Sequence, residues 1–188
     1  MGHTRTTEGL SEMRLNEHTE LDGVRTVAEL MCVAARTAPK ARGVDQIVTA
    51  IVESTEEREH IADRMREIGE RCGAAFFSRD AQNVLDAQML VLIGTGIRRL
   101  RIPGCSFCGH PGCDAAEEAG ARCAYNAGDL GIATGSAVGV AANHRVDNRV
   151  LYTAGSAAVE LGLLGEDVKI AWGIPLSAKG KNLFFDRK

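Results

Sequence analysis

Four of the six cysteines lie close together in the chain, and their type and spacing could do chemistry: Cys105, Cys108, Cys113 and Cys123. Their pattern is C-x2-C-x4-C-x9-C, threaded with glycine and proline residues that let a loop fold around a metal centre. Thiolate sulfur is a soft ligand that suits zinc and iron–sulfur clusters. The spacing therefore predicts a four-thiolate metal site within a loop at about residues 103–125.

The choice between an iron–sulfur cluster and zinc depends on how the four cysteines are paired. Structural zinc sites usually carry two C-x2–4-C pairs, but here nine residues separate Cys113 from Cys123. This asymmetry favours a cluster, and a non-catalytic module with a structural zinc ion is the alternative. His110 could replace one thiolate, although four cysteines already complete a ligand set.

Three arginines stand just before the cysteine segment: Arg98, Arg99 and Arg101. A cluster held by four thiolates is net negative, so nearby cations would stabilise it and raise its reduction potential. The same charges could attract an acidic redox protein partner. The alternative interpretation is a basic edge that only contacts solvent.

The composition is that of an ordinary globular protein, with 188 residues of which 45% are hydrophobic and 25% charged. We expect a polar N-terminal segment at residues 1–20 and a single domain at 21–188. A net charge of −3 indicates neither a nucleic-acid nor an anionic-membrane partner. No apolar run approaches the roughly 20 residues that span a bilayer, and residues 1–20 lack the apolar core of a secretory signal. We therefore expect a cytoplasmic protein, in which disulfides are rare.

Hydrophobic periodicity predicts alternating helices and strands around the cysteine loop. Helices are expected at about residues 22–36, 54–73, 79–87, 114–122, 129–144 and 147–161, and strands at about 47–52, 89–93 and 168–172. The two cysteines outside the loop, Cys32 and Cys72, lie on or beside apolar helical faces. We expect both to be small core side chains.

Several element ends are also predicted by local residue types. Ser54 and Glu57 match a capping box at the start of a helix. Asp147 is expected to cap the helix that follows it. Pro175 is expected to close the last strand, because proline cannot donate a ladder hydrogen bond.

Three glycines recur at every fourth residue of the helix expected at 129–144: Gly131, Gly135 and Gly139. Glycine inside a helix costs about 1 kcal/mol relative to alanine. We expect a close contact along this face to compensate, with a packed helix as the first interpretation and a flat cofactor as the second.

The segment Pro103-Gly104-Cys105-x-x-Cys108-Gly109-x-x-x-Cys113 resembles the small 4Fe–4S domain of corrinoid iron–sulfur proteins and electron-transport subunits. The chain from about residue 29 to 187 resembles the uncharacterised prokaryotic ferredoxin-domain proteins. That wider resemblance is carried by residues 34–43, 129–136, 173–177 and 180–182.

The resemblance implies a nitroreductase-like α+β body, in which helices flank a mostly antiparallel central sheet and the four-cysteine loop is inserted. It also implies a homodimer that uses flavin mononucleotide (FMN), whose phosphate Arg36, Lys40 and Arg42 could hold. An exposed basic loop is the alternative for these three residues. The function expected is iron–sulfur electron transfer, with flavin-linked oxidoreductase activity or a role as an iron–sulfur interaction subunit also open.

Overall fold

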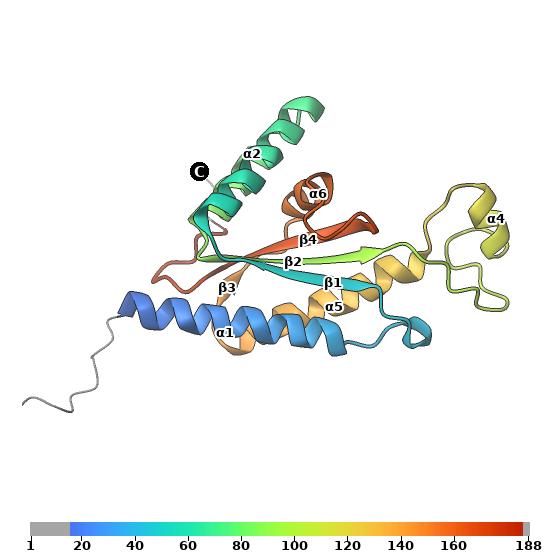
Figure 1. Cartoon of the computed structure of the whole chain (residues 1–188), viewed down its shortest axis with the longest axis horizontal. Helices are drawn as coiled ribbons and strands as arrows, with labels where there is room; N and C mark the ends of the chain where they lie inside the picture. The colour runs from blue at the N-terminus through green and yellow to red at the C-terminus, as the bar shows by residue number, and fades with distance from the viewer. Residues whose placement is uncertain (1–15, 186–188) are drawn as a thin grey trace, which may run out of the picture.

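A four-stranded antiparallel sheet forms the centre of the protein, and the computed structural model describes residues 16–185 (Figure 1). The strands stand in the order β1-β2-β4-β3. Their bounds are Ile47–Val52 for β1, Met89–Gly96 for β2, Asp147–Asn148 for β3 and Val168–Ser177 for β4. All three strand pairs are antiparallel. The expected α+β body with a mostly antiparallel sheet is therefore confirmed.

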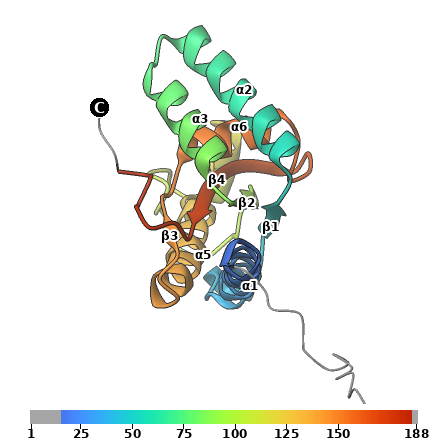
Figure 2. The same ribbon diagram turned by 90° about the vertical axis from the view of Figure 1, so that its left-hand side faces the viewer.

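Helices cover both faces of this sheet (Figures 1 and 2). One face carries α1 (Asn16–Thr37) and α5 (Ala124–Asn143), and the other carries α2 (Thr55–Cys72), α3 (Phe76–Asp86) and α6 (Tyr152–Glu160). The short α4 (Cys113–Glu118) belongs to the cysteine segment, and a 3-10 turn, η1, spans Ala41–Gly43. Within residues 16–185, no helix combines the length and the apolar character needed to cross a bilayer.

The central strand β2 separates two hydrophobic cores. Met89, Val91 and Ile93 face the core beneath α1 and α5. Leu90 and Leu92 face the core beneath α2, α3 and α6. Because alternate side chains of a strand point to opposite faces, a strand that is buried on both sides has a continuous apolar run in its sequence. That run is why β2 was identifiable from sequence.

The start and end of α2 follow the predicted capping residues. The Glu57 backbone N–H donates to the Ser54 side-chain oxygen at 3.1 Å, and the Glu57 carboxylate accepts from the Ser54 hydroxyl. Gly73 ends the helix in the left-handed conformation, with φ of 68°. The prediction for Cys72 is wrong, because this last residue of α2 is exposed. Cys32 packs partly buried against the core, and this burial raises the pKa of its thiol.

The expected helix cap at Asp147 is also wrong. Asp147 and Asn148 instead form β3, which pairs with Ser177 and Leu176 at the end of β4. The following helix, α6, begins five residues later at Tyr152. An aspartate can favour a helix cap locally, but here the long-range pairing with β4 decides its structure.

Pro175 lies inside β4 and does not end the strand. The Gly173 N–H donates to the Leu151 carbonyl at 2.9 Å, so odd-numbered residues of this stretch direct their N–H groups towards the β3 side. The proline nitrogen therefore faces the gap between Leu151 and the β3 pairing at Ser177. No ladder bond is needed there, which explains why the strand tolerates a proline.

The glycine row on α5 faces open space rather than a neighbouring helix of the same chain. A Cβ atom added at Gly131, Gly135 or Gly139 would meet nothing within 4 Å. Helix α5 packs instead through the opposite face, which includes Leu130, Ala133 and Ala137. Within residues 16–185 no neighbour contacts this row, so the packed helix or flat cofactor expected there stays a prediction.

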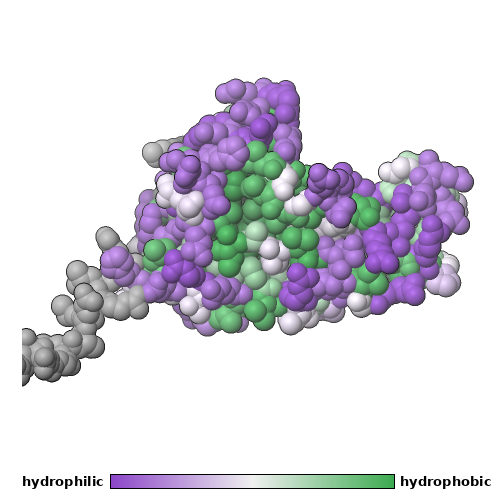
Figure 3. Space-filling view, in the orientation of Figure 1, coloured by the Kyte–Doolittle hydropathy of each residue, from purple (hydrophilic) through white to green (hydrophobic). Residues whose placement is uncertain are grey.

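Strand β1 is an edge strand, and apolar side chains gather between it and α2 (Figure 3). A groove of about 350 Å³ runs there. Its apolar lining comes from Ala50, Ile51, Val52, Ile61, Leu92 and Leu163. This side of the molecule therefore presents both an unpaired strand edge and a hollowed apolar surface.

Candidate metal centre

The cysteine segment projects from one end of the sheet, between the end of β2 at Gly96 and the start of α5 at Ala124 (Figure 1). Neither hydrophobic core includes any of the described residues 94–129. The segment is therefore an insertion carried by two elements of the body, and it contacts the body through hydrogen bonds, such as the one from Arg42 to the Leu100 carbonyl, rather than through either core.

Tight turns built on glycine shape the first part of the segment. Gly104, Gly109 and Gly112 have φ values of 70°, 85° and 119°, a backbone region that residues other than glycine rarely adopt. One turn is closed by the Gly109 N–H, which donates to the Ser106 carbonyl at 2.8 Å. Gly112 stands directly before Cys113, where α4 begins. These turns reverse the chain so that Cys105, Cys108 and Cys113 line one cavity.

The structure brings the four cysteines of the predicted ligand set around one cavity. Cys105, Cys108, Cys113 and Cys123 are all half-buried and all line it. Arg99, Phe107, Ala116 and Tyr125 contribute to the same walls, whereas His110 is not among the lining residues. Cys123, which is separated from the others by α4, reaches the cavity like the rest.

The donor set suits an iron–sulfur cluster, but the cavity is narrow. Its volume is about 20 Å³, about the space of one water molecule. A cluster of several iron and sulfide ions therefore requires the glycine-rich loop to move outwards. No three His, Cys, Asp or Glu side chains among residues 16–185 stand close enough together to hold a single metal ion.

Helix α5 begins directly after the fourth cysteine. Cys123 occupies the N-cap position of this 20-residue helix, and its side chain makes no capping hydrogen bond there. The aligned peptide dipoles place partial positive charge at a helix N-terminus. A thiolate or an anionic cluster at Cys123 therefore lies in a favourable field.

The three arginines before the loop have different surroundings. Arg98 is exposed, and its backbone N–H donates to the buried Asn126 side chain at 2.9 Å. Arg101 is exposed and pairs with Asp114 and Glu117. Arg99 alone of the three lines the cysteine cavity. Arg98 and Arg101 therefore fit the interpretation of a basic edge that contacts solvent. Arg99 instead has the position expected of a cation that stabilises a cluster.

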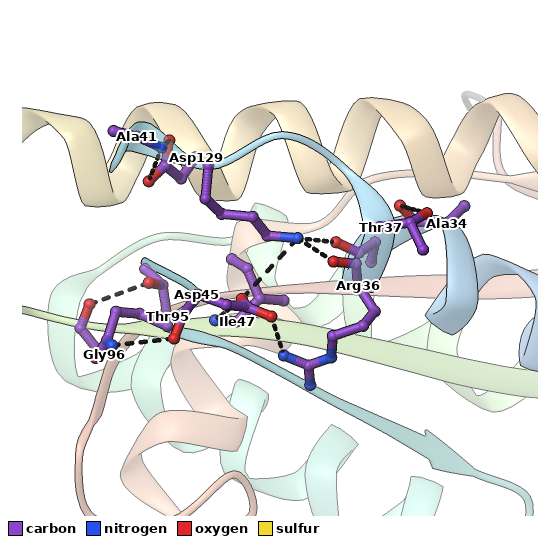
Figure 4. Close-up of polar contacts among 12 residues, drawn as sticks. Ala34, Arg36, Thr37, Ala41, Asp45, Ile47, Thr95, Gly96 and Asp129 are labelled. Atoms are coloured by element: carbon purple, nitrogen blue, oxygen red, sulfur yellow. Dashed lines mark hydrogen bonds and ion pairs between the residues drawn. The ribbon is translucent and has the colours of Figure 1, made fainter. Parts of the chain in front are cut away.

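The basic residues at and after the end of α1 each have a partner within the chain. The Arg36 guanidinium pairs with Asp45 (Figure 4). The Lys40 ammonium donates to the carbonyls of Ala35 and Arg36 at the end of α1, and its side chain is only 5% exposed. Arg42 donates to the Leu100 carbonyl at 2.7 Å. Arg36 and Lys40 therefore share Asp45, which lies 3.9 Å from the Lys40 ammonium, whereas Arg42 is held apart from them at Leu100.

Carboxylates hold the same loop in place. Partial burial acts to raise the pKa of Asp45, but hydrogen bonds from Arg36 and from the Ile47 N–H outweigh it and lower that pKa overall. The buried Asp129 of α5 accepts the Ala41 backbone N–H at 3.0 Å (Figure 4). Asn126 and Asp129 were not singled out from sequence. Their signal is two polar residues, three apart, at the start of the buried and mostly apolar face of α5.

An apolar groove lies next to the cysteine cavity. Its volume is about 440 Å³, and its lining comes from Pro39, Lys40, Ala41, Phe107, Tyr125, Gly128, Asp129 and Ile132. Phe107 and Tyr125 line both the groove and the cavity, and their rings pack 5.2 Å apart. The Phe107 side chain is 68% exposed. An aromatic pair therefore separates the cysteines from a space large enough for a small planar molecule.

Comparison with known proteins identifies relatives at two levels. Residues 119–187 match the family described as "Uncharacterized protein containing a ferredoxin domain (DUF2148)". A protein of Archaeoglobus fulgidus, described as uncharacterized, is 41% identical over 184 residues, which cover 93% of this chain and 98% of that protein.

Two solved structures show the same fold at low sequence identity. A BluB-like flavoprotein from Clostridium difficile superposes with a TM-score of 0.57 at 17% identity, covering 97% of this chain and 87% of that one. A putative nitroreductase from Desulfovibrio desulfuricans, solved in complex with FMN, superposes with a TM-score of 0.57 at 13% identity, covering 97% and 83%. The chain therefore belongs to the family of ferredoxin-domain proteins and has a nitroreductase-like fold.

Proposed function

We propose that this protein carries a 4Fe–4S cluster on Cys105, Cys108, Cys113 and Cys123 and transfers single electrons through it. The observation that supports the proposal is the meeting of all four cysteines around one cavity, at the N-terminus of α5. The ferredoxin-domain family to which the chain belongs is consistent with it.

The residues of the loop would have separate tasks in this function. The four thiolates would hold the cluster, which supplies one-electron chemistry when bound. The N-terminus of α5 would stabilise negative charge beside Cys123. Phe107 and Tyr125, which line the cysteine cavity, would cover one side of the cluster. The exposed position of the loop suits a redox protein partner that docks briefly in the cytoplasm.

A structural zinc ion is the alternative, and the cysteine spacing argues against it. Structural zinc sites usually carry two closely spaced cysteine pairs, whereas nine residues separate Cys113 from Cys123. The cavity itself favours neither centre, because it is too narrow for a cluster and no three ligands among residues 16–185 surround one point.

A flavin-linked oxidoreductase is a second candidate, and the apolar groove beside Phe107 and Tyr125 supports it. A planar ring in this groove would lie beside the cluster, so that one-electron and two-electron steps could be coupled. Two neighbours in fold are described as a flavoprotein and as an FMN complex. The FMN phosphate site at Arg36, Lys40 and Arg42 stays a prediction, and binding there would have to displace their present partners.

The deciding experiment is metal, sulfide and flavin analysis on protein purified without oxygen, together with a visible spectrum. The expected result is about four iron and four sulfide ions per chain, with an absorbance band at about 400 nm. One zinc and no sulfide would overturn the electron-transfer proposal. Bound flavin that is lost when Arg36 and Arg42 are both changed to Gln would support the second candidate. Copurification of a fixed partner without turnover by the isolated protein would indicate an interaction subunit instead.

A further inference from the structure

Arg99 carries a buried hydrogen-bond donor that the protein does not satisfy. Its Nε atom is buried, and no acceptor among the described residues is in reach. Burying an N–H group without an acceptor costs free energy, so such groups are uncommon in native structures. An unsatisfied donor in the wall of a ligand-binding cavity therefore suggests that the ligand supplies the acceptor. Arg99 lies in the wall of the cysteine cavity.

The rest of the Arg99 guanidinium is already occupied, and its contacts fix its position. One terminal nitrogen donates to the carbonyls of Ala116 and Ala121, at 3.4 and 3.3 Å. The other lies 3.7 Å from the Glu117 carboxylate. These contacts join Arg99 to α4 and to the segment that leads from α4 to Cys123. The guanidinium is therefore held against the segment between the third and fourth cysteines.

We propose that Arg99 tunes the metal centre: its Nε–H donates a hydrogen bond to a sulfur atom of the bound cluster and raises the cluster's reduction potential. The inference rests on the cluster proposed above. A hydrogen bond and a positive charge both stabilise the reduced state, which carries one more negative charge than the oxidised state. Because the side chain is only 24% exposed, solvent screens this charge weakly.

Arg101 offers a matched control two residues away. It has the same side chain and belongs to the same loop, but it is 59% exposed and already pairs with Asp114 and Glu117. A charge in that position interacts with the cluster through solvent and is compensated by two carboxylates. Its removal is expected to change the potential less than the removal of Arg99.

The test is a redox titration of the anaerobically purified protein and three variants, Arg99→Gln, Arg99→Lys and Arg101→Gln, with the iron content of each measured first. Arg99→Gln is expected to shift the midpoint potential to a more negative value. Arg99→Lys keeps the charge but has no Nε–H donor at that position, so a smaller negative shift is expected. The midpoint potential of Arg101→Gln is expected to stay closest to that of the wild-type protein.

The outcomes separate this inference from the cluster proposal itself. If the unchanged protein contains no iron or sulfide, the cluster proposal fails. If it contains the cluster and the Arg99 variants keep their iron with an unshifted potential, the role of Arg99 is wrong while the cluster stands. If both Arg99 variants fold but lose iron, Arg99 is a scaffold of the loop and the tuning role is also overturned.

Discussion

The ligand assignment is tested most directly at Cys108. Changing Cys108 to Ala removes one of the four thiolates that line the cavity, and we expect the variant to lose most of its iron when it is purified without oxygen. The matched control is Cys72→Ala, because Cys72 is exposed at the end of α2 and far from the ligand set in sequence. Unchanged iron content in Cys108→Ala would show that the ligands are assigned wrongly.

Two helical glycines of the body should respond to alanine in opposite ways. A Cβ atom at Gly155 would lie 1.8 Å from the Ala171 carbonyl oxygen of β4, so α6 would have to move away from the sheet. We expect Gly155→Ala to lower the free energy of unfolding by about 3 kcal/mol or more. Gly23 is exposed on α1 with open space around it, and Gly23→Ala should raise that free energy by roughly 0.5–1 kcal/mol.

Urea denaturation followed by circular dichroism gives both free energies. Equal effects of the two substitutions would contradict the close contact between α6 and β4.

What sequence reveals about single residues depends on whether their role is local. The cysteine spacing and the Ser54 cap are determined by neighbours along the chain, and both were found in advance. The exposure of Cys72 and the partners of Lys40 depend on how α1 and α2 end in space. Asp129 was overlooked because its partner, the Ala41 N–H, is 88 positions away.

The cysteine loop is the element whose structure should change most when metal binds. Its cavity of about 20 Å³ is too small for a cluster, so binding of the proposed cluster would rearrange the loop, and the new metal–thiolate bonds would then restrain it. We expect trypsin to cut after the exposed Arg101 more slowly in the cluster-loaded protein than in the protein stripped of metal by a chelator. The sites are identified by mass spectrometry of the fragments.

Cleavage after Arg145 provides the internal control for this comparison, because this exposed residue follows α5 at the opposite end of that helix. Its rate should be independent of the metal. A loop that is cut equally fast in both states would contradict metal-dependent ordering.

At the scale of elements, periodicity was sufficient wherever an element is long and buried. The strand at Ile47–Val52 and the two-sided apolar run of β2 follow from residue type alone. The predictions for Asp147 and Pro175, which the structure contradicts, both concern the edge of β4. Strand pairing there joins residues that are about 30 positions apart, and a pattern read along a short window contains no information about such pairing.

The whole molecule leaves surfaces that a second copy could cover, and the homodimer implied by the family resemblance stays a prediction. The row of Gly131, Gly135 and Gly139 has open space above it, and Ile132 beside it is 47% exposed. If this face of α5 packs against a partner, Gly135→Glu should convert the dimer into a monomer, because a buried unpaired charge is costly. Light scattering after gel filtration measures the mass.

The control for this experiment is Ser78→Glu, which adds the same charge to the exposed surface of α3. It should leave the mass unchanged. A monomeric wild-type protein would contradict the homodimer. If Gly135→Glu remains a dimer, the interface does not include this face of α5, and the apolar edge along β1 is the next surface to test (Figure 3).

The separation of the cysteine segment from both hydrophobic cores has a consequence for cooperativity. Residues 94–129 add nothing to either core, so the loop and the body can lose their order independently. Calorimetry of the cluster-loaded protein should then show two transitions, and removal of the metal should abolish the first while leaving the second in place. The body would therefore stay folded after oxidative loss of the proposed cluster and could bind it again.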